Sequence, residues 1–209
     1  MTDTDQAAQA ESRPHTGRKV YLVPMVLDVH EAPEGYAERV EAYWREVGEH
    51  VSRLEARYGA VRKIYHESLP VSGEEGLKII ERVNPNAHRM LDRKQKKGAQ
   101  LVNIEDQGLL QEAMDWGRCL AVISSPTVFR QASAAYQEAN RKRFLAMARR
   151  LDEDLQDEEV ALLVVEPEHA LQFPPDVQVF FIAPPSLDEI NRLLRDHAQK
   201  EQREEQSEA

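Results

Sequence analysis

The chain has 209 residues, of which 41% are apolar and 31% are charged, and its formal net charge is −10. This composition is typical of one globular domain and excludes a chain that is disordered throughout. The apolar runs are much shorter than the roughly 20 residues that cross a bilayer, and the acidic balance disfavours a protein that coats nucleic acid non-specifically.

Both ends of the chain are polar and lack apolar periodicity. We therefore expect a disordered tail at residues 1–17 and a disordered acidic tail at residues 199–209. Between them, residues 18–198 contain no repeat and no flexible linker, which predicts a single domain.

The first expected element is a strand at residues 19–27. Pro24 should place it at a sheet edge or a bulge, because proline cannot donate to the hydrogen-bond ladder. Apolar residues then recur at helical spacing from Tyr36 to Tyr58, and Gly59 is a suitable C-terminal stop. This part of the chain is therefore predicted to be a strand followed by a long amphipathic helix.

The middle of the chain predicts shorter elements, separated by glycine, proline and polar turns. We expect strands at 61–66 and 100–104, and helices at 77–83, 87–97 and 109–123. The last of these helices should be interrupted near Gly117, because glycine disfavours a helix interior.

A long helix is expected after Ser125, which is a good N-cap and precedes Pro126 at the first helical position. The apolar spacing continues for about 29 residues, or roughly 43 Å. Such a helix should either span the molecule or project one end toward a partner.

Residues 160–165 and 177–182 are continuously apolar, as is typical of strands covered on both faces. A final helix begins near Ser186. The alternation of strands and helices predicts an α/β fold, namely a three-layer sandwich with a mixed, mostly parallel central sheet and one long helix.

No phosphate-binding loop and no zinc-ligand spacing occur in the sequence, so we expect neither a cofactor nor a metal. Two short segments follow predicted strands, where α/β sheets tend to place ligands. They contain His66 with Glu67, and Glu166 with His169. If these residues meet, they could act as an acid/base pair in a small hydrolase or transferase.

The single cysteine, Cys119, cannot form an internal disulfide, so we expect a cytoplasmic protein that makes no membrane contact. Cys119 lies in a helical segment and is expected to pack in the core, as buried cysteines usually do.

Lysine and arginine are concentrated in two helical segments of this acidic chain. Such clusters can bind RNA phosphates or an acidic partner surface. The candidate residues are Arg89, Arg93, Lys94, Lys96 and Lys97 in the first segment, and Arg141, Lys142, Arg143, Arg149 and Arg150 in the second.

The C-terminal third carries a basic helix from Arg141, a strand from Val160, a loop with His169, a strand from Val177 and a closing helix. This order resembles the C-terminal domains of release-factor/Pelota-like proteins, whose fold is related to a ribosomal RNA-binding family. Members that release peptides carry a Gly-Gly-Gln loop in another domain, and this chain has none. The resemblance therefore implies a translation-associated binding module without peptide-release activity.

Three functions follow from these features. The leading one is a non-enzymatic interaction protein that presents its long basic helix to a protein partner. The first alternative is a factor that binds the ribosome or RNA through the two basic segments. The second alternative is the hydrolase or transferase built on His66, Glu67, Glu166 and His169. Partner identity and oligomeric state are left open.

Overall fold

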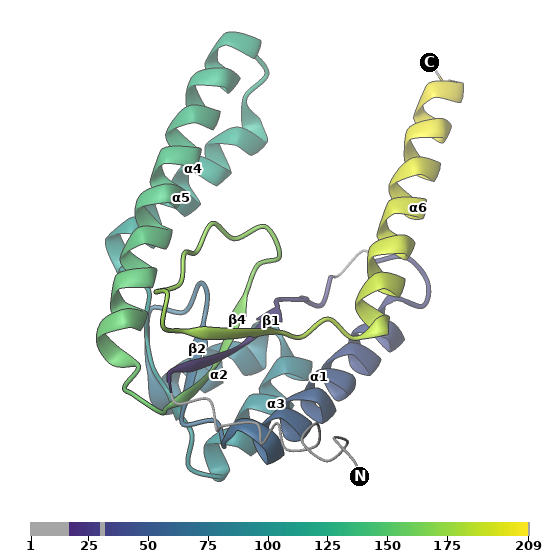
Figure 1. Ribbon diagram of the computed structural model, residues 1–209. Coiled ribbons are helices and arrows are strands. Elements are labelled where there is room, and N and C mark those ends of the chain that lie inside the picture. Colours follow the sequence, from purple (N-terminus) through teal and green to yellow (C-terminus); the bar gives the residue numbers. More distant parts are fainter. Residues whose placement is uncertain (1–16, 30–31, 209) are drawn as a thin grey trace, which may run out of the picture.

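A computed structural model describes residues 17–29 and 32–208 as a parallel sheet between helices (Figure 1). Apart from Gly17, the predicted N-terminal tail lies outside these residues. The strands are β1 Lys19–Pro24, β2 Lys63–His66, β3 Gln100–Leu101, β4 Val160–Val165 and β5 Gln178–Phe181. The helices are α1 Tyr36–Tyr58, α2 Gly73–Val83, α3 Pro85–Lys96, α4 Gln107–Val122, α5 Pro126–Asp154 and α6 Pro185–Glu208.

The strand order is β3-β2-β4-β1-β5, and all four pairings between neighbours are parallel. The predicted α/β fold is confirmed. Within the described residues, the sheet contains no antiparallel strand, so it is wholly parallel rather than mixed. Because parallel strands are joined by crossovers, each strand end on the carboxyl side opens into a loop at the same edge of the sheet.

Successive strand residues face opposite sides of the sheet and fill two separate cores. One core holds Tyr21 and Ile64 together with residues of α1, α2, α3 and α6. The other holds Leu22 and Tyr65 together with Phe144, Met147 and Leu151 of α5. Helices therefore cover both faces, which makes the three layers that the sequence predicts.

Two expectations about the strands are wrong. β1 is an interior strand between β4 and β5, and Pro24 is tolerated there because it is the last residue of the strand, beyond the pairing with β5. β5 is an edge strand, and Phe181 is 62% exposed. The apolar run at 177–182 therefore does not mark a strand buried on both faces.

Two helices also differ from expectation. α4 is continuous through Gly117, where the helix packs against α5 and an added Cβ would lie 3.6 Å from the Tyr136 ring, an ordinary contact distance. α6 extends to Glu208, so the predicted C-terminal tail is helical. Its lysine, glutamine, arginine and glutamate residues favour helix, and no glycine or proline ends it.

The predicted long helix is confirmed as α5, with Ser125 at its N-cap and Pro126 at its first position. Helices α4 and α5 form an antiparallel hairpin, and Figure 1 shows it rising away from the sheet on one side of the molecule, with α6 on the other. In the part of the chain that is described, no helix is both long enough and apolar enough to cross a membrane.

Candidate functional site

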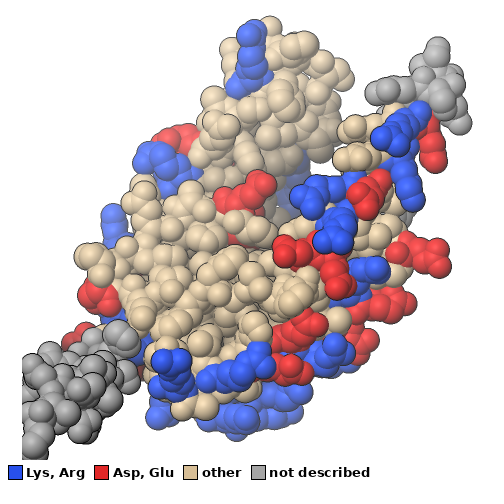
Figure 2. All heavy atoms as spheres, turned by 45° about the vertical axis from the view of Figure 1, so that its right-hand side comes forward, with Lys and Arg blue, Asp and Glu red and all other residues tan. Residues whose placement is uncertain are grey.

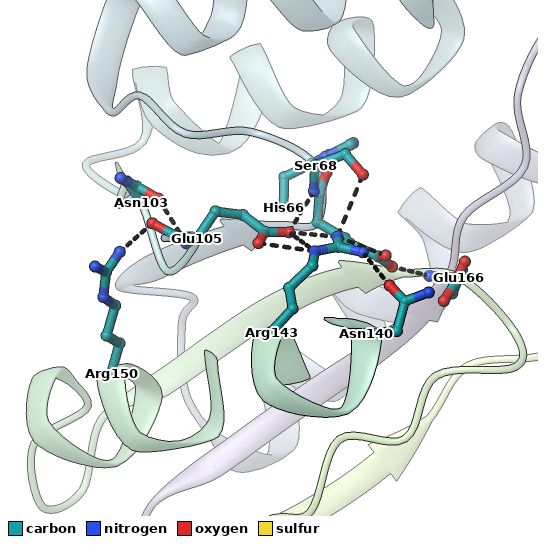
Figure 3. A network of polar contacts seen from close by, with 9 residues as sticks. His66, Ser68, Asn103, Glu105, Asn140, Arg143, Arg150 and Glu166 are labelled. Carbon is teal, nitrogen blue, oxygen red and sulfur yellow. Dashed lines mark hydrogen bonds and ion pairs between the residues drawn. The ribbon is translucent and has the colours of Figure 1, made fainter. Parts of the chain in front are cut away.

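A buried group of charges joins α5 to the carboxyl edge of the sheet (Figure 3). Arg143 of α5 donates from Nη2 to Glu67 Oε1 at 2.8 Å and to Glu105 Oε1 at 2.5 Å, and from Nε to Glu105 Oε2 at 3.0 Å. The side chains of these three residues are 6%, 2% and 0% exposed, respectively. We call Glu67, Glu105 and Arg143 the carboxylate–arginine network.

Backbone N–H groups donate further hydrogen bonds to the oxygens of Glu67 and Glu105. The Ser68 N–H donates to Glu105 Oε1 at 2.8 Å, and the Glu166 N–H donates to Glu67 Oε2 at 2.6 Å. Arg150, two turns further along α5, donates to the Glu105 carbonyl and pairs with Asp106 at 3.0 Å. Asp106 in turn caps α4 by accepting from the Gly108 and Leu109 N–H groups. The base of the hairpin is thus fixed to three strand ends.

The topology explains why these residues meet. β2 lies between β3 and β4, so the segments that follow these three strands are neighbours at one edge. The sequence placed His66, Glu67 and Glu166 after strands, and the hydrogen bond between Glu67 and the Glu166 N–H shows that the two segments do come together. Glu105, which also follows a strand, was missed, although the same rule applies to it.

Two titratable side chains of this edge have shifted pKa values. Burial lowers the pKa of His66, whose Nδ1 lies 2.6 Å from the Glu67 carbonyl and whose buried Nε2 has no partner among the described residues. Burial, and then the charge of Glu67, raise the pKa of the half-buried Glu166. Since His66 is enclosed, this arrangement favours the neutral form of the imidazole.

His169 lies nearby and is half-buried. Its pKa is lowered by burial, although the charge of Glu67 opposes the shift, and its Nδ1 accepts the Leu171 N–H at 3.2 Å. Ser68 adopts a left-handed backbone with φ of 62°, which a residue with a side chain rarely adopts. The turn at Ser68 is held by the hydrogen bond from its own N–H to Glu105.

These contacts define what the site can do chemically. Each oxygen of Glu67 and of Glu105 already accepts at least one hydrogen bond, from Arg143 or from a backbone N–H group. No set of three or more His, Cys, Asp or Glu side chains within residues 17–29 and 32–208 is arranged to hold a metal ion. The network is therefore built to position α5, and the acid/base pairing of His66, Glu67, Glu166 and His169 stays a prediction.

The basic residues divide into buried and exposed groups. Arg143 is buried in the network, and Lys94 is buried against Glu55, with a distance of 2.5 Å between Nζ and Oε2. The expectation that these two contact a partner is corrected, since carboxylates from neighbouring elements already neutralise them. The candidates that remain exposed are Arg89, Arg93, Lys96, Lys97, Arg141, Lys142 and Arg149.

Much of the charge on the long helix is also paired. Arg141 makes two hydrogen bonds of 2.7 Å to Glu138, and Arg150 pairs with Asp106. In the described chain, only Lys142 and Arg149 of that segment are exposed cations that form no ion pair. The basic character of α5 is therefore weaker than its sequence indicates.

The far end of the hairpin has a different character. Residues 119–129, which we call the hairpin tip, contain no charged residue. Val122 is 81% exposed and Phe129 is 47% exposed, and Figure 2 shows the upper lobe as largely uncharged surface. Cys119 is exposed as well, so its assignment to the core is wrong. The reason is that α4 and α5 pack only against each other there.

No family model, curated protein or solved structure is significantly similar to this chain. The resemblance of the C-terminal third to release-factor/Pelota-like proteins therefore stays a prediction.

Proposed function

We propose that this protein is a non-enzymatic interaction protein that uses its hairpin tip to pair with a second copy of itself. The observation that carries the proposal is the exposed, uncharged apolar surface at the end of a projecting hairpin whose base is held by the carboxylate–arginine network. Contiguous exposed apolar surface of this kind marks interaction sites. The single cysteine supports a cytoplasmic setting for this role.

Charge is compatible with a second copy as the occupant when the contact is made through the hairpin tips. The chain has a net charge of −10, so two bodies repel each other at short range. Between Pro126 and Phe144, the first α5 residue in the sheet core, the helix advances about 27 Å. That length exceeds the Debye length of about 8 Å at physiological salt, so contact through the tips keeps the charged bodies apart.

Geometry favours the same occupant. A lone two-helix hairpin leaves apolar residues uncovered on both helices, here Met114 on α4 and Phe129 on α5. Two hairpins related by a twofold axis would cover these residues in a four-helix bundle. Symmetric pairs that use one surface twice are the commonest oligomers.

The test is sedimentation velocity over a concentration series. We expect the wild-type chain to form dimers and Val122→Glu to be a monomer at the same concentrations. Burying a valine is worth about 1.5–3 kcal/mol, and the dimer contains the substitution twice, so the dissociation constant should rise about 100-fold or more.

The matched control is Val83→Glu, which places the same change at a 54% exposed valine at the end of α2. This variant should dimerise as the wild type does. A wild-type chain that stays monomeric at every concentration, or a dimer that Val122→Glu and Val83→Glu affect equally, would contradict the proposal.

A further inference from the structure

A groove with a volume of about 620 Å³ runs between α1 and α3, on the opposite side of the sheet from α5. Arg45 and Arg53 line it from α1, and Arg93 and Lys97 line it from α3 and its C-cap. All four side chains are exposed. We call these four residues the cationic groove.

The groove is positively charged, whereas the chain as a whole is negatively charged. Its lining contains one carboxylate, Glu49, and a fifth cation, Lys94, which Glu55 neutralises. Within the described part of the chain, Arg53, Arg93 and Lys97 form no ion pair, and Arg45 is 4.0 Å from Glu46. Figure 2 shows lysine and arginine side chains gathered along the lower part of the body. The first hollow therefore carries an excess of positive charge in an acidic protein.

The cations on α3 form a regular row. Arg89, Arg93 and Lys97 follow one another at intervals of four residues, so each step along the helix advances about 6 Å. A second hollow of about 460 Å³ shares Arg45 and Arg93 with the first and extends the groove toward Arg89; Glu41 and Asp92 also line this hollow, and Glu41 Oε1 lies 4.0 Å from Arg89 Nη1. This step is close to the separation of successive phosphates in an extended nucleic acid strand.

Gly48 lines the groove and, because it has no side chain, leaves space at the bottom of the groove. Gly48 lies in the interior of the 23-residue helix α1, where glycine costs about 1 kcal/mol relative to alanine. Helix packing does not require it, because an added Cβ would meet only Met90 Cγ, at an ordinary distance of 3.6 Å. A longer side chain at position 48 would instead occupy the groove.

We propose that the cationic groove, together with Arg89 at its end, binds the sugar–phosphate backbone of single-stranded nucleic acid, with about three phosphates aligned along Arg89, Arg93 and Lys97. No aromatic side chain lines the first hollow for base stacking, and Trp44, which lines the second hollow, is buried. Recognition therefore depends on phosphate charge and not on base or sugar. This inference is independent of the hairpin tip, which lies elsewhere on the molecule.

The test is fluorescence anisotropy with labelled 12-residue oligouridine and oligothymidine strands across a range of salt concentrations. Three phosphate contacts predict a slope of log affinity against log salt of about −2 for both strands. Arg93→Gln should weaken binding several-fold and reduce the slope by about 0.7. Arg149→Gln, which removes an exposed cation from α5, is the matched control and should change neither quantity.

Two variants at the groove floor test the shape without altering charge. Gly48→Ala should bind as the wild type does, and Gly48→Met should weaken binding several-fold, with thermal unfolding measured to show that both variants fold. Binding that does not depend on salt would overturn the proposal. Equal effects of Arg93→Gln and Arg149→Gln on binding would also overturn it. So would a competition experiment in which polyglutamate displaces the strand as well as tripolyphosphate of the same total charge does.

Discussion

Replacing Arg143 with methionine should destabilise the fold severely, because it leaves Glu67 and Glu105 buried without their cation. Both carboxylates are at most 2% exposed, and Arg143 donates to them from two nitrogens. Breaking a buried ion pair by removing one partner costs about 3–5 kcal/mol. In a chain of this size, each kcal/mol lowers the midpoint by about 2–4 °C, so the variant should melt about 6–20 °C below the wild type.

Thermal unfolding followed by circular dichroism measures this difference. Arg141→Met is the matched control, because Arg141 is an exposed residue of the same helix, paired with Glu138. Its midpoint should stay close to that of the wild type. Combining Arg143→Met with Glu67→Gln and Glu105→Gln should recover part of the loss, since no charge is then left unpaired. Equal midpoints for Arg143→Met and Arg141→Met would refute the role assigned to the network.

Two further predictions concern the dependence of stability on pH, measured by urea unfolding at a series of pH values. Because the pKa of folded His66 lies below its ordinary value of 6.5, the unfolded chain binds a proton that the folded chain does not, and stability falls as the pH drops below about 6.5. His66→Asn should flatten this decline, and an unchanged slope would show that His66 is not its source. The pKa of folded Glu166 is raised above 4.5, the ordinary value that applies to the unfolded chain. The folded chain therefore holds this proton more tightly, and stability falls as the pH rises from about 4.5 through the pKa of the folded chain. Glu166→Gln should therefore be more stable than the wild type at pH 7, with the difference shrinking toward pH 4, and a variant less stable at pH 7 would contradict this assignment.

Elements with a strong periodic signal were predictable from sequence. The spacing of Tyr36, Val40 and Val47 places α1, and Ser125 with Pro126 marks the start of α5. The prediction from Pro24 that β1 lies at a sheet edge or a bulge was wrong, because a single sequence does not reveal where a strand stops pairing. The prediction that residues 177–182 form a strand covered on both faces was wrong, because the apolar content of a segment does not determine the position of its strand in the sheet.

The candidate site was predictable only in part. The positions of His66, Glu67 and Glu166 after strands followed from a general rule about parallel sheets. The burial of Arg143 could have been inferred, because Ala139, Met147 and Leu151 lie at intervals of four residues from it on the buried face of α5. Its partners Glu67 and Glu105 could not be inferred, because a single sequence does not show which loops lie against that face.

The position of β1 has a consequence for synthesis on the ribosome. Lys19 pairs with Val160 on one side and with Gln178 on the other. β1 therefore cannot complete its pairing until β4 and β5 have been synthesised. Contacts between such distant parts of a chain slow folding, and unpaired apolar strands are prone to aggregation until they form. The chain must therefore be synthesised through Phe181 before the central layer closes, and until then Val20 and Leu22 of β1 lack their neighbours in the sheet.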